Sequence, residues 1–515
     1  MMKKNILYLI AIMAVFAGCV KKEKFISPTL PNWQPEIGVP LVNSQLTLSD
    51  LIKERNNGNI SLSTDTNGLY LLTYTDTAFS AIAQDIVKIP DQVYAVPAFP
   101  LTSNQVLLDS IVFNGQGTLT QADLKAGDLS FNMLTTDLAE NFTVTLTFPT
   151  ILNKATNAPF SVSKNSGMQA SFSLTGNFAG YDIHFKPGGN QFDFNITITG
   201  ATAGTMSGTL NITNIQYSLL QGSFNSIPIG VMASESDVSI FKNLFQGNIY
   251  FADPRVEFDF ESSFGVQLTP NKQYFQTIYQ NNSFDNMNGG DLEPSANKVI
   301  APATTIGSTT TTVLTVNNAN STDGGGLVSL KTALSKGPQK VKYAVNPVLG
   351  NMPGFIKDDS KITIIGKLII PFYGRVTSYS LQDTFAIKIQ HTDSIQFADF
   401  YIKTTNNVPL ELRLQVYFVD TTTYARIDSF FTGAIPLLKA PIVDLNGAII
   451  SAGIDDQTVT FPHARIKPLE KANKLIVKAT MQTPNPGSQD VKFFKTNNLD
   501  IKISMHAKFD IPLVK

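Results

Sequence analysis

Apolar and polar residues alternate with a period of two along much of the chain. In residues 141–148, NFTVTLTF, apolar side chains occupy every second position and threonines lie between them. The same alternation recurs in residues 191–200, 411–418 and 500–509. It predicts antiparallel strands that bury one face and expose the other, and the Gly, Asn, Pro and Asp residues between them are typical of sandwiches or barrels. The pattern predicts an all-β protein of tandem antiparallel β-sandwich domains.

Helical patterns are scarce by comparison. Residues 47–55, TLSDLIKER, begin with a capping-box-like pair, Thr47 and Asp50, and place apolar side chains on one face. Residues 239–245, SIFKNLF, form a second short candidate. We therefore expect only a few short helices.

A polar, low-complexity stretch divides the β-rich sequence. Residues 297–326 are rich in Thr, Asn and Ser and end in three glycines, which favours a flexible linker. The alternative is a polar β-hairpin, because the segment TTTTVLTV has good strand propensity. The domains expected after the N-terminal segments are a β-rich region at 41–160, a β-sandwich at 161–296, a polar linker at 297–340 and a C-terminal β-sandwich at 341–515.

A faint internal repeat lies on both sides of that stretch. Residues 250–268 and 396–414 each contain Phe-Ala-Asp, then a strand pattern, a polar kink and a second strand pattern. The register slips by two residues between them, so chance similarity is the alternative. A true repeat would indicate two similar β-units joined in tandem.

The N-terminus has the three-part layout of a secretory signal peptide. Two lysines precede an apolar run at residues 6–16, and Ala17 and Gly18 then precede Cys19, the single cysteine of the chain. The run is too short to span a bilayer, which takes about 20 apolar residues. Residues 1–18 are predicted to be the signal peptide. An ordinary signal with an accidental cysteine, or a short membrane anchor, is the alternative.

Residues 16–19, FAGC, resemble the end of a bacterial lipoprotein signal, although Phe16 stands where leucine is usual. The resemblance implies cleavage before Cys19 and acylation of its thiol, for example with palmitate, so that the membrane is reached through a lipid anchor. Val20 is not the aspartate that favours inner-membrane retention, which points to the outer membrane. The mostly basic residues 21–24 differ from the acidic residues typical of surface-displayed lipoproteins. We therefore expect the periplasmic face rather than the cell surface.

The segment after the lipidated cysteine, residues 19–40, is expected to be an extended tether. Pro28, Pro31 and Pro35 favour a semi-rigid spacer. Trp33, the single tryptophan, is expected to hold this segment against a domain rather than to bind a ligand.

Composition excludes several classes of protein. Without Lys3 and Lys4, 37 of the 39 basic residues remain against 40 acidic residues, a net charge of −3. No basic run is interleaved with aromatic residues, so we expect no nucleic-acid partner. One cysteine allows no disulfide framework. The 35 phenylalanines, against 15 tyrosines and one tryptophan, indicate apolar cores that provide the stability.

Residues 406–420, NNVPLELRLQVYFVD, resemble a stretch found in uncharacterised Bacteroidota-type outer-membrane lipoproteins. The strand–kink–strand pattern is also similar to that of LEA-2-type, immunoglobulin-like β-sandwiches. These resemblances imply a fold and a compartment, not an activity. Four Asp-Ser/Thr tripeptides further resemble the short O-glycosylation motif of Bacteroidota-type exported proteins, and a Thr/Ser-rich chain also produces them by chance. The acceptors would be Thr77, Ser110, Ser394 and Thr421.

Candidate catalytic and metal-binding motifs are weak. His391-Thr-Asp-Ser394 places triad residues side by side, whereas triads assemble from distant segments. Ser161 to Lys164 matches S-x-x-K but lacks the accompanying motifs. Asp285, Asp291 and Glu293 could form a weak calcium site, although a surface loop fits better. The four histidines, none of them in a metal-ligand spacing, are His184, His391, His463 and His506.

These observations predict a non-enzymatic, lipid-anchored cell-envelope protein without a cofactor or metal. It would act as a scaffold or subunit of an outer-membrane assembly, with envelope proteins as partners. The alternative is a carbohydrate- or lipid-binding lipoprotein, in which the Phe-rich residues 102–222 form an apolar groove. A third possibility is an enzyme whose carboxylates meet from distant strands, which motifs do not reveal.

Overall fold

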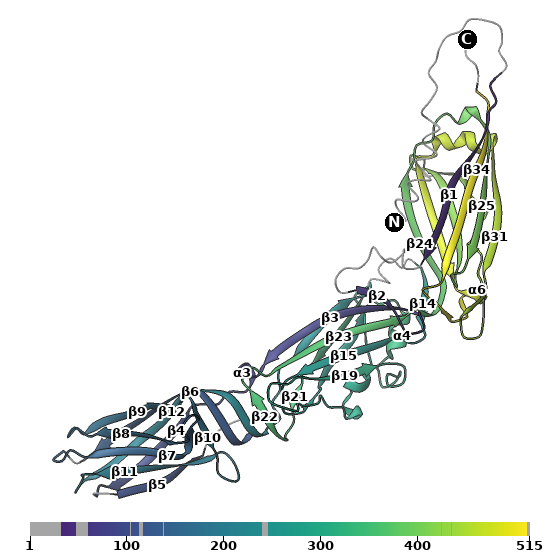
Figure 1. Cartoon of the computed structure of the whole chain (residues 1–515). Helices are drawn as coiled ribbons and strands as arrows, with labels where there is room; N and C mark the ends of the chain where they lie inside the picture. The colour runs from purple at the N-terminus through teal and green to yellow at the C-terminus, as the bar shows by residue number, and fades with distance from the viewer. Residues whose placement is uncertain are drawn as a thin grey trace.

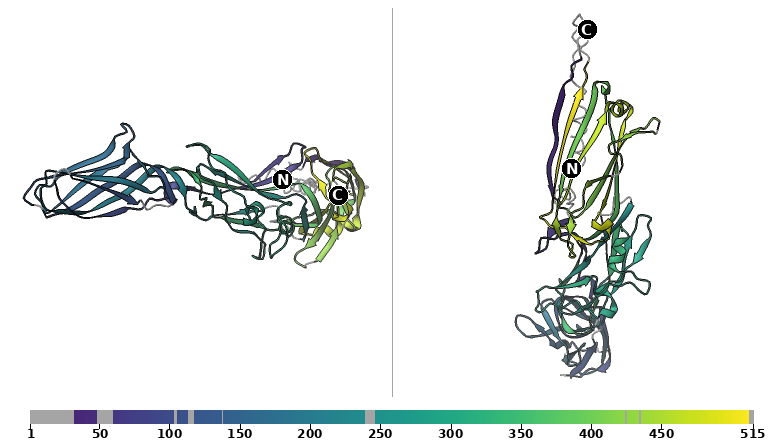
Figure 2. Two further views of the ribbon diagram at one scale, coloured as in Figure 1. Left: turned by 90° about the horizontal axis from the view of Figure 1, so that it is seen from below. Right: turned by 90° about the vertical axis from the view of Figure 1, so that its right-hand side faces the viewer.

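The computed structural model describes residues 32–47, 60–102, 105–112, 117–136, 138–238, 246–423, 425–433 and 435–511. They form an all-β protein of antiparallel sheets with a few short helices, which confirms the predicted β-sandwich fold class. The sheets gather into three modules that follow one another in an elongated molecule (Figure 1). The two further views in Figure 2 show the same succession. We call the modules the base, middle and tip domains. Of the helix predicted at 47–55, Thr47 ends β1 and the other residues lie outside the described residues, as does the helix predicted at 239–245.

The base domain packs two sheets around a core of its own. The first sheet has the order β1 (Glu36–Thr47), β34 (Asn498–Phe509), β25 (Ile395–Asn406) and β31 (Gly453–Pro462). The second has the order β14 (Gln246–Phe251), β24 (Tyr373–Ala386), β32 (Lys474–Gln482), β26 (Glu411–Asp420) and β27 (Ala425–Ser429), with β28 (Ile435–Leu438) on β26 and β33 (Val491–Lys492) on β24. Buried side chains from both sheets, such as Ile402, Phe418 and Met505, meet between them.

The middle domain is built from a five-stranded and a four-stranded sheet. The larger has the order β19 (Thr310–Val316), β15 (Arg255–Ser262), β23 (Lys361–Pro371), β3 (Tyr70–Ile82) and β2 (Ile60–Thr64). The smaller has the order β13 (Met232–Asp237), β20 (Lys340–Val345), β17 (Lys272–Ile278) and β18 (Phe284–Asn286), and the helix α4 (Leu330–Ser335) precedes β20.

The tip domain is one ten-stranded sheet that surrounds a phenylalanine-rich core. Its main order is β22 (Pro353–Lys357), β12 (Thr205–Phe224), β6 (Gly117–Thr135), β10 (Tyr181–His184), β7 (Thr143–Asn153), β11 (Gln191–Thr199) and β5 (Gln105–Val112), with β4 (Gln92–Pro100) on β12, β8 (Pro159–Asn165) on β7 and β9 (Ser171–Asn177) on β6. The predicted alternation explains this core: in β7, Phe148 is fully buried while Thr145 and Thr147 lie on the outer face, and in β11 the buried Phe192 and Phe194 lie on either side of Asp193. Phe148 also packs edge-on against Phe178, with ring centroids 5.7 Å apart.

The chain travels out to the tip and returns. It begins in the base domain with β1, passes through β2 and β3, builds the tip from β4 to β12, and comes back through the middle domain to finish at β34. The ends of the described chain are therefore joined: β1 pairs with β34 along its length, and Trp33 and Ile511 exchange two backbone hydrogen bonds of 2.9 Å. The sheets join segments far apart in sequence, so they do not follow the boundaries expected at 160/161, 296/297 and 340/341.

The expected linker at 297–340 also differs from the structure. It contains β19, which pairs with β15, and the buried side chains of Leu314, Leu330 and Leu334. Strand propensity in TTTTVLTV outweighed the polar composition, but the strand pairs with β15 and not in the local hairpin of the alternative. The neighbouring sheet supplies the partner strand, which local composition does not reveal.

The proposed internal repeat does not correspond to equivalent structures. Phe251 ends β14 and Asp253 lies in the turn before β15, whereas Phe397 and Asp399 both lie inside β25. The same Phe-Ala-Asp sequence therefore leads into a turn in one case and lies within a strand in the other.

One residue of the predicted polar face in β26 is buried. Gln415 alternates with the apolar positions of the strand, yet it is only 5% exposed. Its Nε2 donates to the backbone oxygens of Phe431 and Gly433 at 3.0 Å, and its Oε1 accepts from the Phe431 amide at 3.3 Å. The side chain thus satisfies the backbone of a loop that folds over the strand, which alternation alone does not predict.

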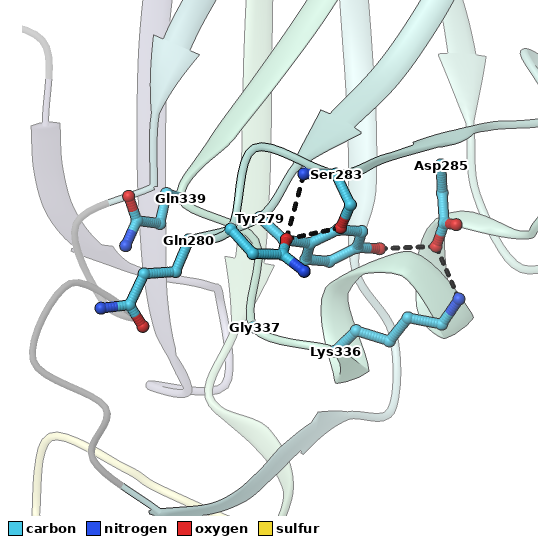
Figure 3. A pocket seen from close by; sticks show the side chains of 8 residues that line it. Tyr279, Gln280, Ser283, Asp285, Lys336, Gly337 and Gln339 are labelled. Atoms are coloured by element: carbon cyan, nitrogen blue, oxygen red, sulfur yellow. Dashed lines mark hydrogen bonds and ion pairs between the residues drawn. The ribbon is translucent and has the colours of Figure 1, made fainter.

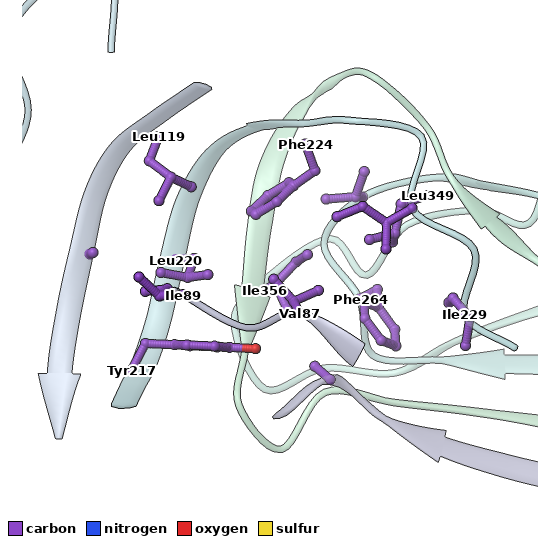
Figure 4. Packing of buried hydrophobic residues seen from close by; sticks show 14 of the residues in the cluster. Val87, Ile89, Leu119, Tyr217, Leu220, Phe224, Ile229, Phe264, Leu349 and Ile356 are labelled. Atoms are coloured by element: carbon purple, nitrogen blue, oxygen red, sulfur yellow. The ribbon is translucent and has the colours of Figure 1, made fainter. Parts of the chain in front are cut away.

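The middle and tip domains share one continuous hydrophobic core. β22 leaves the middle domain and pairs with β12 from Leu219 to Ser223, so a strand of one module completes the sheet of the other. Figure 4 shows the side chains of Leu220, Ile356 and Phe264 in this continuous packing. The two modules should therefore behave as one cooperative unit.

The base and middle domains are joined by strands and a cluster of three aromatic residues. β23 continues into β24 through Phe372 alone, and β14 is followed closely by β15, so two neighbouring strands cross the joint. Three backbone hydrogen bonds of 2.8–3.0 Å join these residues in a ring. The Tyr70 amide donates to the Phe493 oxygen, the Phe493 amide donates to the Phe372 oxygen, and the Phe372 amide donates to the Tyr70 oxygen. Their rings pack edge-on, with centroids 6.5 and 6.3 Å apart. These contacts restrict bending at the joint.

Replacement of Ile356 by alanine tests the shared core. We expect Ile356→Ala to lower the free energy of unfolding by about 2–5 kcal/mol, because the fully buried side chain leaves a cavity. Tip and middle should still unfold together in denaturant melts followed by amide hydrogen exchange. The exposed Val231→Ala is the control and should change stability by less than about 0.5 kcal/mol. Loss of the tip alone, with the middle domain intact, would contradict a shared core.

Candidate interaction surfaces

The open edge of the tip domain carries exposed apolar side chains. β5 ends the sheet and pairs only with β11 among the described strands. Its residues Leu107 and Ile111 face inward, while Val106, Leu108 and Val112 face solvent, and Leu108 is 71% exposed. Val106, Leu108 and Val112 together form what we call the apolar edge patch. Patches of this kind mark contact surfaces more often than scattered apolar residues do.

The edge strand β5 has little of the usual protection against pairing apart from the inward-pointing Asp109. Edge strands are commonly protected by lysine, proline or a bulge, and β5, with the sequence QVLLDSIV, has neither lysine nor proline. The β4 edge, in contrast, contains Pro97 and Pro100. β5 is therefore the more accessible of the two edges for a partner.

A tyrosine–aspartate bridge closes the sandwich beneath the patch. The Tyr94 hydroxyl of β4 donates to the Asp109 carboxylate of β5, and the Tyr94 ring packs edge-on against Phe194, with centroids 5.4 Å apart. The hydrogen bond to Asp109, with a smaller effect of burial, raises the pKa of Tyr94 to about 12. The bridge links β4 to β5 and so helps to hold in place the strand that carries Leu108.

A hollow of about 450 Å³ lies on the middle domain between the β17–β18 turn and the segment after α4 (Figure 3). The side chains around it are mostly amides, hydroxyls and one ion pair. The lining residues are Tyr279, Gln280, Asn281, Ser283, Asp285, Lys336, Gly337 and Gln339.

Three of these side chains form a hydrogen-bonded network. Asp285 accepts from the Tyr279 hydroxyl and from Lys336 Nζ, both at 2.6 Å. Burial opposes the charge on Asp285, but the bonds from Lys336 and Tyr279 outweigh it and lower the pKa of the carboxyl group. Burial, followed by the bond to Asp285, raises the pKa of Tyr279. The network is neutral overall and suits a polar, uncharged ligand better than an ion.

The three carboxylates considered as calcium ligands each bind different protein groups. Asp291 accepts from the Thr315 amide at 2.9 Å and from Asn320 Nδ2 at 3.2 Å, while Glu293 pairs with Lys272. Asp285 belongs to the network in the hollow. Within the part of the chain that the structure describes, no group of three or more His, Cys, Asp or Glu residues could hold a metal ion.

The weak catalytic motifs do not assemble either. Ser161 lies on β8, and its hydroxyl shares a 2.9 Å hydrogen bond with Thr147 on the outer face of the tip. In the His391–Ser394 segment, Asp393 forms an ion pair with Lys467 at 3.1 Å. Ser161 thus lies beside another hydroxyl, and Asp393 is paired with a lysine, so neither motif shows the arrangement of an activated nucleophile and its base.

The histidines lie at strand ends or beside polar groups. His184 ends β10, and His391 is exposed before a 3₁₀ turn. His463 Nδ1 lies 2.7 Å from the Ile395 oxygen, and His506 faces Glu36 from the outer side of β34 at 3.5 Å.

The structure places three of the four possible glycosylation acceptors in defined settings. The Ser110 hydroxyl donates to Asp193 at 2.6 Å, and the Thr421 hydroxyl donates to Asn473 at 3.0 Å. Ser394 is half-buried in a 3₁₀ turn. Thr77 lies in β3 opposite Ile365, and its side chain, like all of Cys19, is outside the described residues. Glycosylation at these positions stays a prediction.

Sequence reasoning missed both surfaces. β5 did carry a signal, since Val106–Leu107–Leu108 places apolar residues on both faces of one strand, unlike the half-polar strands around it. The hollow carried none, because Tyr279 and Lys336 are distant in the chain and ordinary in composition.

Comparisons with known proteins assign no family. No family model and no curated protein matches the chain. A protein of Parabacteroides distasonis ATCC 8503, described as a "putative secreted protein", is 9% identical over 92% of this chain and 99% of its own, with a TM-score of 0.26. The CBM22-1–CBM22-2 tandem of Xyn10C from Paenibacillus barcinonensis is 10% identical over 57% and 98%, with a TM-score of 0.16. The VP2 subviral particle of infectious bursal disease virus is 8% identical over 76% and 73%, with a TM-score of 0.15. Scores this low support no functional argument.

Among the residues that the structure describes, none of the helices has the length and apolar character needed to cross a bilayer.

The ion pair in the hollow generates a pH-dependent prediction. Asp285→Asn keeps the acceptor for Tyr279 but removes the charge beside Lys336, so we expect a loss of about 1 kcal/mol or less at pH 7. Because the pKa of Asp285 is lowered by folding, its carboxylate stabilises the fold above the ordinary value of 3.8, and this effect disappears as the pH falls through the folded value. Chemical denaturation of both proteins between pH 7 and pH 3 should therefore show converging stabilities.

The matched control for this prediction is Asp359→Asn. Asp359 pairs with Lys357 at 3.0 Å but is largely exposed, so its substitution should have little effect at either pH. A constant difference between Asp285→Asn and the unsubstituted protein at all pH values would show that the charge of Asp285 contributes nothing.

Proposed function

We propose that this chain is a non-enzymatic lipoprotein of the bacterial outer membrane that serves as a scaffold or subunit of an envelope assembly. Lipid on Cys19 would hold the base domain at the membrane, on the periplasmic face. The tip domain would contact an envelope protein.

One observation carries this proposal: the ends of the described chain meet at one pole of an elongated molecule. Trp33 and Ile511 are paired there, and Trp33 lies 14 residues after Cys19 in the sequence. The tip domain occupies the opposite end (Figure 1). An anchor at the N-terminus would therefore hold one pole and present the other, which is the geometry of a spacer or a scaffold.

The contact surface that we assign to the partner is the apolar edge patch. Its three large apolar residues lie on the domain farthest from the anchored pole, and β5 offers an edge without lysine, proline or bulge for main-chain hydrogen bonds. An extended strand of a partner could add to such an edge. The fully buried residues of the tip, in contrast, form a packed core of the kind that stabilises a structural module.

A second candidate function is carbohydrate binding. The hollow beside Tyr279 supports it, because amides, hydroxyls and a neutral ion-pair network suit the hydroxyl groups of a sugar. The lipid-carrier alternative has less support, since Phe131, Phe148, Phe192 and Phe194 fill the interior where an apolar groove was expected. Glycan arrays with and without Gln280→Ala would separate this candidate from the scaffold proposal.

Substitution of Cys19 tests the anchor. We expect Cys19→Ser to move the protein from the membrane pellet to the soluble fraction, because the acyl chains that supply the binding energy are lost. Membrane fractionation and mass spectrometry of the N-terminal peptide would measure this. Val20→Ser is the matched control and should stay in the pellet. An unmodified Cys19 peptide from the unsubstituted protein would contradict the anchor.

Substitution of Leu108 tests the partner surface. We expect Leu108→Asp to abolish co-purification of the partner after crosslinking in cells, because a charge would have to be buried in an apolar contact. Stability should change by less than about 0.5 kcal/mol, since the side chain is exposed. Val231→Asp makes the same kind of change on another exposed apolar residue and should retain the partner. A partner retained by both variants would exclude the patch as its binding surface.

A further inference from the structure

Trp33 occupies a fixed but exposed position. Its amide donates to the Ile511 oxygen and its oxygen accepts from the Ile511 amide, both at 2.9 Å, so its backbone is held as firmly as a strand residue. The side chain is nevertheless 57% exposed. The sequence led us to expect that Trp33 holds the tether against a domain, and only the backbone does so. More than half of the surface of this large aromatic residue is thus open to solvent at the border of the base domain.

The pole around Trp33 is formed by strand ends and short helical turns of the base domain. β1 starts and β34 ends beside Trp33, and β25 starts there because Ile395 lies opposite Phe509. The 3₁₀ turn at Thr392–Ser394 and the helical segment from His463 to Lys471 complete the pole. This surface is the end of the molecule that lies farthest from the middle domain (Figure 1).

The distance to the lipid anchor is limited by the chain. Fourteen residues separate Cys19 from Trp33, so the two are at most about 50 Å apart even when the chain is fully extended. Three of those residues are Lys21, Lys22 and Lys24, against a single acidic residue, Glu23. Basic residues next to a membrane are attracted to anionic lipids by about 1 kcal/mol each. The segment therefore favours a short separation between the pole and the lipid.

The polar groups of the pole are compatible with a lipid surface. Lys388, Lys467 and Lys471 are exposed there. The carboxylates have protein partners: Asp510 accepts from Gln34 and Gln396 at 3.3 and 3.2 Å, Asp393 pairs with Lys467, and Glu470 accepts from the Thr392 amide at 3.0 Å. The three lysines are matched by these three carboxylates, so the pole itself is close to neutral, and the basic residues 21–24 supply the attraction to anionic lipid.

We propose that Trp33 inserts into the headgroup layer of the membrane and seats the base domain on the lipid surface. Tryptophan is enriched in this layer because its ring is apolar and its indole N–H remains hydrogen-bonded. The inference rests on the proposed lipidation of Cys19. It adds a second contact beside the acyl chains, and two contacts fix an orientation that one flexible tether leaves free.

The single tryptophan makes a direct test possible with the full-length lipidated protein. The protein is reconstituted into phosphatidylcholine–phosphatidylglycerol vesicles, with and without brominated acyl chains, and tryptophan emission is recorded. We expect emission at shorter wavelength than for Cys19→Ser protein in buffer, and a loss of intensity in the brominated vesicles. A control with Trp33→Phe and Tyr274→Trp moves the tryptophan to an exposed position of the middle domain and should show neither effect.

Vesicle flotation separates the two possible failures. If the protein floats with the vesicles while Trp33 emission matches that of the Cys19→Ser protein and is not quenched, the headgroup contact is refuted and the anchor stands. If the protein neither floats nor carries lipid by mass spectrometry, the proposed anchor itself is refuted. Quenching of the Tyr274→Trp control to the same extent as Trp33 would also overturn the inference, because the molecule would then lie flat.

Discussion

The antiparallel pairing of β1 with β34 is the interaction on which the rest of the molecule depends. It joins the first and last described strands in one sheet, so a chain that builds the other two modules between them must leave the base domain and come back to it. The outward path builds one side of the middle domain and most of the tip. The return path supplies the strands that close both modules. A chain folded in this way presents its middle, not its end, at the far pole.

The connections between the three modules follow from the same path of the chain. Because the chain crosses each boundary more than once, strands rather than loops connect the modules: β22 completes the tip sheet, and β23 runs into β24. Apolar packing continues across the middle–tip joint, and Tyr70, Phe372 and Phe493 close the base–middle joint with mutual backbone bonds. In such a molecule the position of the base domain determines the position of the tip domain. This property suits a protein that is proposed to hold a partner at a set distance from a membrane.

Local sequence patterns predicted the elements but not their partners. Strict alternation in β7 and β11 identified strands and their buried faces, because the environment of one strand is sufficient to decide that pattern. The pairing of β1 with β34 and the place of β19 in a sheet depend on contacts between distant segments, which alternation does not encode. Gln415 shows the same limit for a single residue, since its burial is decided by a loop sixteen residues away. For the candidate surfaces, β5 carried a readable sign in its two apolar faces, whereas the hollow beside Tyr279 exists only in the folded chain.

The height of the tip domain above the membrane depends on the proposed lipid anchor and on the elongated shape of the molecule, and it determines where the contact surface lies. It can be measured by energy transfer from a dye on Leu108→Cys to acceptor lipids in vesicles that carry the lipidated protein, because an acylated Cys19 leaves no other thiol to label. An upright, seated molecule predicts transfer no greater than that from a dye held in bulk water. Efficient transfer from the tip to the lipid acceptors would show that the molecule lies along the bilayer, and would contradict the function proposed for it.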